Sequence, residues 1–156
     1  MKNSFAAIIQ ARVGSTRFPR KVIKDLHGRT MTEFLLERLK RCDPIDEIII
    51  ATTFSEEDDI LKEIAKRQNV KIVRGDTRDV LSRYQKAAEN CLSENIIRIT
   101  ADCPLIDPNL ISSIIDAFLS NNYQYISNSY PPTYPDGLDV EIFTKSLLKE
   151  TFENCN

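Results

Sequence analysis

Apolar and polar residues follow a regular order along the chain, in which short apolar runs alternate with patterns of helical spacing. The apolar runs that predict strands cover residues 5–9, 47–52, 70–73 and 96–100. The helical patterns cover residues 30–42, 55–65, 79–90 and 109–120. Two further strands are predicted at residues 125–128 and 138–143, before an amphipathic helix that begins at Lys145. Repeated strand–helix units predict an α/β fold, a mostly parallel sheet with helices on both faces.

Three predicted helices begin with recognisable capping signals. Thr30–Glu33 fits a capping box, in which the threonine and the glutamate satisfy free backbone N–H groups reciprocally. Ser55–Asp58 repeats that signature, and Asp107 with Pro108 supplies an N-cap and a proline at the first helical position. The expected buried sides carry Ile60, Leu61, Ile64 and Ala65 in one helix, and Val80, Leu81, Tyr84, Ala87, Ala88 and Cys91 in the next.

The bulk composition indicates one globular domain, residues 1–156, without a general affinity for polyanions. The chain is 42% hydrophobic and 28% charged, with a net charge of −2. We therefore expect neither nucleic acid nor a membrane as a partner, and no apolar run reaches membrane-spanning length. Four cysteines without a C-x-x-C pair and a single histidine argue against a zinc site. Reduced thiols predict a cytoplasmic protein.

A basic segment directly follows the first predicted strand. Residues 12–24 contain five arginines and lysines and no acidic residue, although the chain as a whole is slightly acidic. Like charges on one loop repel each other unless an anion lies among them, and α/β folds bind phosphate at the carboxyl end of the first strand. The alternative is an ordinary solvated basic surface.

Several common catalytic motifs are absent from the sequence. The chain has no G-x-x-x-x-G-K-[ST], no G-x-G-x-x-G after the first strand and no G-x-S-x-G. These absences disfavour a P-loop NTPase, a dinucleotide-dependent dehydrogenase and an α/β-hydrolase.

Carboxylates lie near the expected phosphate-binding edge. Asp102 comes just after the strand predicted at residues 96–100, and Mg²⁺ is commonly held by one or two carboxylates together with substrate phosphates. The alternative role for Asp102 is that of a turn or capping residue. Asp139 and Glu141 would share one face of the strand predicted at residues 138–143, where they could supply a second metal ligand or bind a sugar. The alternative there is a polar edge strand.

Four blocks of the sequence, in order, resemble one enzyme family. The blocks are residues 8–22 (IIQARVGSTRFPRKV), residues 74–84, residues 98–108 and residues 136–141. They are similar to the CMP-sugar synthetase type of cytidylyltransferases, and more narrowly to the spore coat polysaccharide biosynthesis protein F branch. The similarity extends over almost the whole chain.

The resemblance implies a glycosyltransferase-A-like nucleotidyltransferase fold, a Rossmann-like three-layer α/β/α sandwich. It also implies the roles of individual residues. The nucleotide-binding residues would be Gln10, Ala11, Arg12, Gly14, Ser15, Arg17, Lys21, Arg74 and Asp76. Catalysis would depend on Arg12, Lys21 and Asp102, and Asp102 and Asp139 would hold Mg²⁺.

The implied reaction is the transfer of CMP from CTP to a sugar hydroxyl with release of pyrophosphate, in surface or spore coat polysaccharide biosynthesis. Two residues depart from the family pattern, because Arg20 and Ala101 stand where glycine is frequent. Family members also continue well beyond this length and usually carry an arm used in dimer formation. We therefore expect the chain to lack the family's C-terminal part, and a homodimer is one expected assembly. The alternative function is a truncated, non-catalytic nucleotide-binding module or partner subunit.

Overall fold

The computed structural model describes residues 3–15 and 18–155, and the strands of this part of the chain form one sheet in the order β3-β2-β1-β4-β6-β5. The strands are β1 (Phe5–Gln10), β2 (Glu47–Thr53), β3 (Lys71–Gly75), β4 (Asn95–Thr100), β5 (Tyr125–Ser127) and β6 (Glu141–Thr144). The first four are parallel neighbours, β6 is antiparallel to β4, and β5 is antiparallel to β6. This arrangement confirms the mostly parallel α/β sheet.

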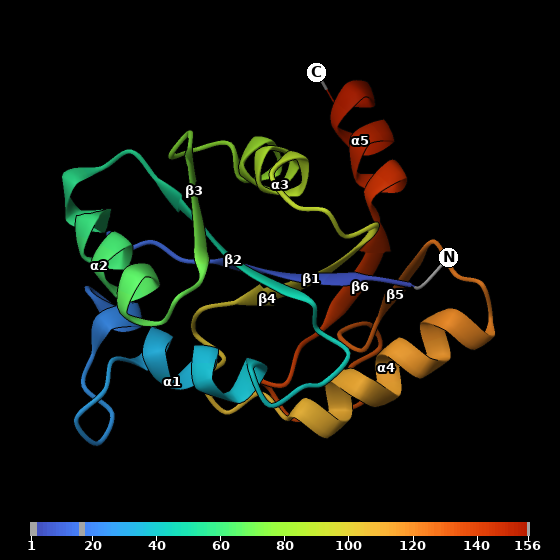
Figure 1. Cartoon of the computed structure of the whole chain (residues 1–156), viewed down its shortest axis with the longest axis horizontal. Coiled ribbons are helices and arrows are strands. Elements are labelled where there is room, and N and C mark those ends of the chain that lie inside the picture. Colours follow the sequence, from blue (N-terminus) through green and yellow to red (C-terminus); the bar gives the residue numbers. More distant parts are fainter. Residues whose placement is uncertain (1–2, 16–17, 156) are drawn as a thin grey trace.

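The helices pack on both faces of the sheet, which makes a three-layer sandwich (Figure 1). They are α1 (Met31–Leu39), α2 (Asp59–Arg67), α3 (Val80–Glu89), α4 (Pro108–Ser120) and α5 (Lys145–Asn154), with short 3-10 turns at η1 (Lys21–Ile23) and η2 (Glu56–Asp58). One apolar core lies between the sheet and α1, α2 and α4, and a second lies between the sheet and α3 and α5. Apolar strands buried on both faces therefore hold the two helical layers together.

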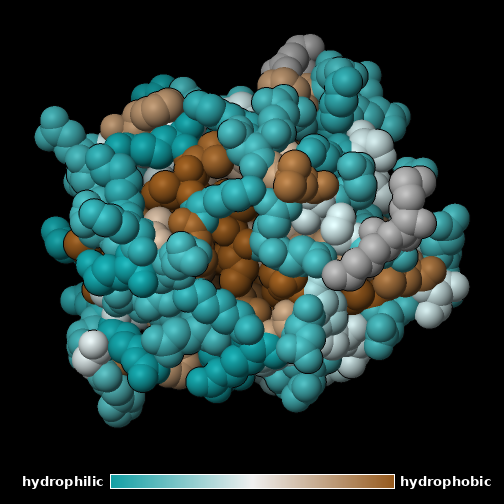
Figure 2. All heavy atoms as spheres, in the orientation of Figure 1, coloured by the Kyte–Doolittle hydropathy of each residue, from teal (hydrophilic) through white to brown (hydrophobic). Residues whose placement is uncertain are grey.

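Figure 2 shows that on this face hydrophobic side chains gather in the middle, where the sheet runs between the helical layers, while hydrophilic side chains cover the periphery. Among the helices of the described residues, none combines the length and the apolar character that crossing a bilayer requires.

The capping signals are confirmed at two helices and wrong at a third. Thr30 and Glu33 form both bonds of the capping box, and the Asp107 carboxylate accepts a hydrogen bond from the Asn109 N–H. Ser55, in contrast, makes no side-chain cap, because the chain first forms the η2 turn. The Asp58 carboxylate is buried and accepts hydrogen bonds from other segments of the chain.

The buried faces of α2 and α3 differ in part from the predicted ones. Ile60 and Val80 were expected to be buried, and each is 37% exposed. Arg83 is instead almost fully buried, and its guanidinium donates a hydrogen bond to the Asp76 carbonyl. This arginine fits because Gly75 has no side chain, and a Cβ at Gly75 would lie 2.8 Å from the Arg83 Cγ. Helical spacing alone does not show such a close approach.

The predicted strand at residues 138–143 is shorter in the structure and begins at Glu141. The preceding residues are bound to the Asn128 side chain, which donates to the Leu138 carbonyl and accepts from the Val140 N–H. The Asn128 N–H also donates to the Val140 carbonyl at 3.4 Å, so one residue of the neighbouring segment binds this stretch through both its backbone and its side chain. Asp139 therefore lies in a loop and does not share a strand face with Glu141, which corrects the sequence prediction.

Candidate active site at the carboxyl edge of the sheet

The carboxyl ends of β1 and β4 lie next to each other and place two sequence-predicted segments together. Gln10 and Thr100, the last residues of these strands, are partners in the parallel ladder. The Ala101 N–H extends this pairing with a hydrogen bond of 3.1 Å to the Gln10 carbonyl. The basic segment that follows β1 therefore faces the loop that follows β4, as the strand order requires.

An ion pair joins these two loops. The Lys21 Nζ lies 2.6 Å from the Asp102 Oδ2, and the two side chains are 26% and 39% exposed. Partial burial by itself would raise the pKa of the Asp102 carboxyl, but hydrogen bonds from Lys21 and Thr100 and the Lys21 charge hold that pKa below its ordinary value. Asp102 is therefore a carboxylate at neutral pH.

Two cavities meet at this ion pair. The basic cavity, of about 280 Å³, is lined by Gln10, Arg12, Ser15, Lys21, Val22, Arg98, Thr100, Ala101 and Asp102. The acidic cavity, of about 380 Å³, is lined by Lys21, Thr100, Asp102, Cys103, Asp136, Gly137 and Asp139. Since Lys21 and Asp102 line both, the pair separates a side rich in cations from a side rich in carboxylates.

The acidic cavity has the oxygen donors that Mg²⁺ prefers. Asp102 and Asp139 both line it, together with Asp136. Within the described residues, no three histidine, cysteine or acidic side chains stand close enough together to hold a metal ion by themselves. This donor set fits Mg²⁺, which commonly takes one or two carboxylates and completes its coordination with substrate phosphate and water.

Cys103 lines the acidic cavity but is not a reactive thiol. Its side chain is buried, which raises the pKa of the thiol, and the neighbouring carboxylates of Asp102, Asp139 and Asp136 raise that pKa further. A neutral thiol is a poor nucleophile and a poor metal ligand.

Asp58 positions the basic segment, a role that the sequence prediction missed. Its carboxylate accepts a hydrogen bond of 2.7 Å from the Val13 N–H and one of 3.2 Å from the Thr53 N–H. The side chain is only 1% exposed, and it thereby joins the loop after β1 to the end of β2. The run of four acidic residues at 56–59 is the sequence signal that pointed to this segment.

The first turn of the basic segment is compact. The backbone N–H groups of Ser15 and Arg20 both donate to the Val13 carbonyl, at 2.8 Å and 3.2 Å. Arg20 itself has a φ of 58°, a left-handed conformation in which glycine costs less than arginine. Gly14 lies in this turn, and Arg17 falls outside the described residues, so its predicted role stays a prediction.

Two further predicted nucleotide-binding residues lie at the end of β3, away from both cavities. The Arg74 guanidinium donates to the carbonyls of Thr53 and Ser55, at 2.5 Å and 2.7 Å, and pairs with Asp59. The Asp76 carboxylate accepts from two backbone N–H groups of its own turn, which lowers its pKa. The Arg74 contacts stabilise the loop after β2, and the Asp76 contacts stabilise the turn after β3. The roles of Arg74 and Asp76 in nucleotide binding stay predictions.

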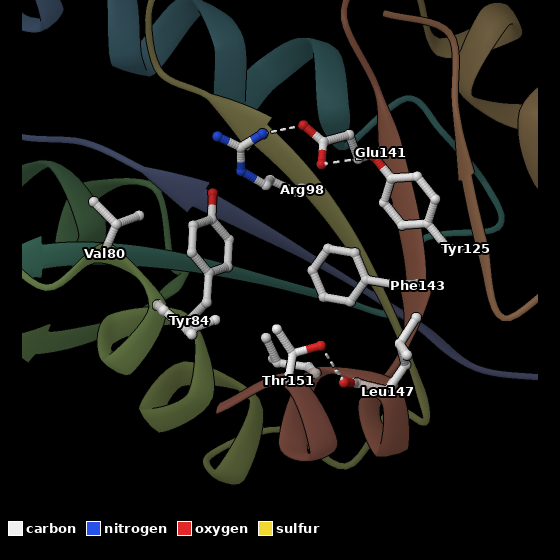
Figure 3. Close-up of a pocket in the computed structure, with 10 residues that line it drawn as sticks. Val80, Tyr84, Arg98, Tyr125, Glu141, Phe143, Leu147 and Thr151 are labelled. Atoms are coloured by element: carbon white, nitrogen blue, oxygen red, sulfur yellow. Dashed lines mark hydrogen bonds and ion pairs between the residues drawn. The ribbon is translucent and has the colours of Figure 1, made fainter. Parts of the chain in front are cut away.

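The remaining acidic candidate, Glu141, faces a different cavity. It forms an ion pair with Arg98, its partner in the β4–β6 ladder, and accepts a hydrogen bond of 3.3 Å from the Tyr125 hydroxyl. Figure 3 shows these three side chains at one end of a cavity between the sheet and helices α3 and α5. Asp139 and Glu141, expected on one face, therefore serve separate parts of the molecule.

Comparison with known proteins identifies the family of the chain. The family model described as Cytidylyltransferase matches residues 6–155. The chain belongs to the cytidylyltransferase family. The crystallised cytidylyltransferase of Leptospira borgpetersenii is 37% identical and superimposes with a TM-score of 0.94 over 99% of this chain and 66% of that one.

Two curated relatives of this cytidylyltransferase chain are longer than it is. An uncharacterized protein of Methanocaldococcus jannaschii is 39% identical over 95% of this chain and 60% of its own length. The spore coat polysaccharide biosynthesis protein SpsF of Bacillus subtilis is 35% identical over 94% of this chain and 61% of its own length. The chain thus spans about three fifths of the length of these relatives.

Proposed function

We propose that the protein transfers CMP from CTP to a hydroxyl group of a sugar and releases pyrophosphate. The observation that carries this proposal is the Lys21–Asp102 pair, which joins a cavity lined by cations to one lined by carboxylates. A nucleoside triphosphate needs both kinds of partner, because its oxygens attract arginine and lysine while its Mg²⁺ requires carboxylates. Membership of the cytidylyltransferase family supports CTP as the nucleotide.

Arg12, Ser15 and Lys21 would bind the triphosphate in the basic cavity. All three line that cavity, and the compact turn around Gly14 lies beside them. Arginine offers a planar fork and lysine a point charge, so the two supply different geometries to phosphate oxygens. Phosphoryl transfer needs mainly positioning and charge stabilisation, and these residues supply both as charge develops on the departing pyrophosphate.

Lys21 would change partner when the triphosphate binds. In the free protein its ammonium group is neutralised by Asp102 at 2.6 Å. A phosphate oxygen in the basic cavity offers a second anionic partner, which draws Lys21 away and leaves the Asp102 carboxylate available. Asp102 and Asp139 are the residues that would hold Mg²⁺, whose charge would neutralise the triphosphate oxygens.

The proposed pathway is the synthesis of a surface or spore coat polysaccharide, as in the branch to which SpsF belongs. The likeness to SpsF over 94% of this chain supports that assignment. The acceptors would be acid sugars of the kind that CMP-sugar synthetases use. We also propose that the protein works in the cytoplasm, where CTP is made available, and as a homodimer.

Thermal unfolding of this chain with CTP, UTP, ATP or GTP, each with and without Mg²⁺, tests the proposal. We expect a rise in the melting temperature that is selective for CTP and requires Mg²⁺, because a ligand that binds only the folded state stabilises it. Pyrophosphate release with acid sugars then measures transfer. Stabilisation by CTP without pyrophosphate release from any sugar would favour a non-catalytic nucleotide-binding module, and no shift with any nucleotide would contradict the proposed site.

A further inference from the structure

Arg83 is a buried cation without a counter-ion. It lies in α3 and is 2% exposed, and its Nη1 donates hydrogen bonds to the carbonyls of Asp76 and Thr77 in the turn after β3. Among the described residues its Nε has no hydrogen-bond partner and its guanidinium forms no ion pair, unlike Arg74 and Arg98. Burying an unpaired charge is costly, and arginine remains charged at neutral pH. A charge kept at such a cost indicates a use beyond packing.

The fold makes room for the Arg83 side chain at the carboxyl edge of the sheet. Arg83 packs against Gly75, the last residue of β3, where a Cβ would lie 2.8 Å from the Arg83 Cγ. Gly75 is the ladder partner of Thr53, at the end of β2. The Asp58 carboxylate joins the N–H of Thr53 to the N–H of Val13, at 3.2 Å and 2.7 Å. Arg83 therefore lies at the same edge of the sheet as the basic segment.

Arg12 and Arg83 are like charges that act on each other. Burial lowers the pKa of the Arg83 guanidinium, and the Arg12 charge lowers that pKa further, while Tyr84, Asp76 and Asp58 act in the opposite direction. Arg12 lines the basic cavity, so this repulsion reaches the place where the phosphates would bind. A polyanion in that cavity would attract both arginines, and the field of a buried charge is screened less by water and salt than that of an exposed one.

We propose that Arg83 is a positioning residue of the nucleotide site, which holds the turn at residues 76–79 and adds a buried positive charge near Arg12, so that the site prefers a triphosphate to a monophosphate. This inference rests on the proposed function. The attraction grows with the charge of the ligand, so loss of the Arg83 charge should weaken CTP more than CMP. A merely structural role would weaken both nucleotides alike, because they share the base, the ribose and the first phosphate.

Calorimetric titration with CTP and with CMP, each with and without Mg²⁺, tests this assignment. Arg83→Gln keeps an N–H donor and removes the charge, and without Mg²⁺ it should weaken CTP about 10-fold and CMP by no more than about 3-fold. Arg83→Lys keeps the charge and should retain the preference for CTP within about 2-fold of wild type. The matched control is Arg41→Gln, at an exposed arginine between α1 and the start of β2, which should change neither affinity.

A spectroscopic measurement on the wild-type protein does not depend on the folding of any variant. Because Arg83 is buried, its Nε–H should give a slowly exchanging signal in ¹H–¹⁵N spectra. At saturation CTP should shift this signal more than CMP does, since additional phosphate charge changes the electric field at the guanidinium. Equal shifts with the two nucleotides, or no shift with either, would contradict the proposed coupling.

The outcomes separate this inference from the proposed function. If wild-type protein binds CTP, but Arg83→Gln binds both nucleotides as before or weakens both by the same factor, the inference is overturned and the proposed function stands. If wild-type protein binds neither nucleotide under any condition, both fail. If Arg83→Gln weakens CTP more than CMP and no sugar yields pyrophosphate, the inference is supported and only the proposed transfer fails.

Discussion

The basic cavity and the apolar cavity are neighbours that the chain builds in opposite ways. The basic cavity consists of loop residues at the ends of β1 and β4, and its principal charges, Lys21 and Asp102, neutralise each other at 2.6 Å. The apolar cavity, between the sheet and helices α3 and α5, has a single polar end, where the Arg98–Glu141 ion pair lies and the Tyr84 hydroxyl faces Arg98 (Figure 3). The charges of one site lie at a partly exposed rim, whereas the polar groups of the other lie beside apolar side chains.

This difference concerns how much each kind of site lowers the stability of the folded protein. Charged side chains at a rim remain partly hydrated and can pair with each other, so they do not strain the fold. A buried hydroxyl cannot reach water, so it depends on a partner inside the protein, which for Tyr84 is Arg98. Variants at the two sites should therefore differ in what they change, activity at the rim and stability in the cavity.

The largest expected effect comes from breaking the ion pair at the rim. Lys21→Ala and Asp102→Asn should each lower the rate of pyrophosphate release roughly 10²–10³-fold, the typical cost of losing one preorganised charge-stabilising group. Steady-state assays with CTP and an accepted sugar measure the change. Lys24→Ala, at an exposed lysine of the same segment outside both cavities, is the matched control. Near-normal turnover in either variant would remove that residue from the catalytic set.

The next effect concerns the carboxylate that holds the basic segment in place. Asp58→Ala leaves the buried N–H groups of Val13 and Thr53 unpaired and should lower the free energy of unfolding by about 3 kcal/mol. Urea denaturation measures this loss, and Glu56→Ala, an exposed acid of the same run, should change stability by less than about 0.5 kcal/mol. Equal stability of the two variants would mean that Asp58 does not anchor the loop.

A smaller effect should appear in the pH dependence of stability. The pKa of Asp102 is depressed in the folded state, so its pairing with Lys21 stabilises the fold above the ordinary carboxyl pKa and is lost as the pH falls through the folded value. Because both side chains are partly exposed, wild-type protein should exceed Asp102→Asn by under about 1 kcal/mol at about pH 7. Urea titrations should show this difference disappearing as the pH falls through the folded-state pKa, and a constant difference would refute the linkage.

The smallest expected effect is the stability change at the apolar cavity. Tyr84→Phe removes a buried hydroxyl that interacts with Arg98, so the free energy of unfolding should fall by roughly 0.5–1 kcal/mol. Urea denaturation measures the change, and unchanged stability would mean that the hydroxyl contributes nothing to the free protein.

Much of the rim was predictable because its signals are local. The apolar run of β1 followed by five cations, and β4 followed by Asp102, place the two segments at one edge once the strands are parallel. The mostly parallel sheet, the layers, the capping box at Thr30 and the N-cap at Asp107 follow from spacing in the same direct way. Asp139 reaches the acidic cavity, although from a loop and not from the expected strand face.

The apolar cavity was not predictable, because its residues look like ordinary core residues in the sequence. Tyr84 was expected on a buried helix face, and it is buried, but spacing does not reveal that its hydroxyl faces Arg98 across the cavity (Figure 3). Asp58 was missed for a different reason, because the Ser55–Asp58 spacing predicted a helix cap. Its burial depends on Val13, which is 45 residues earlier in the chain.

The sequence by itself determined the order of strands and helices, the basic segment after β1 and the carboxylate after β4, because periodicity and charge are carried by neighbouring residues. Only the tertiary structure decided which side chains became partners. Lys21 meets Asp102 across 81 residues, Glu141 pairs with Arg98 instead of joining Asp139, and the Tyr84 hydroxyl faces Arg98 (Figure 3). The physical reason is that pairing and burial depend on how the two helical layers and the strand ends come together, and that packing involves residues far apart in the chain.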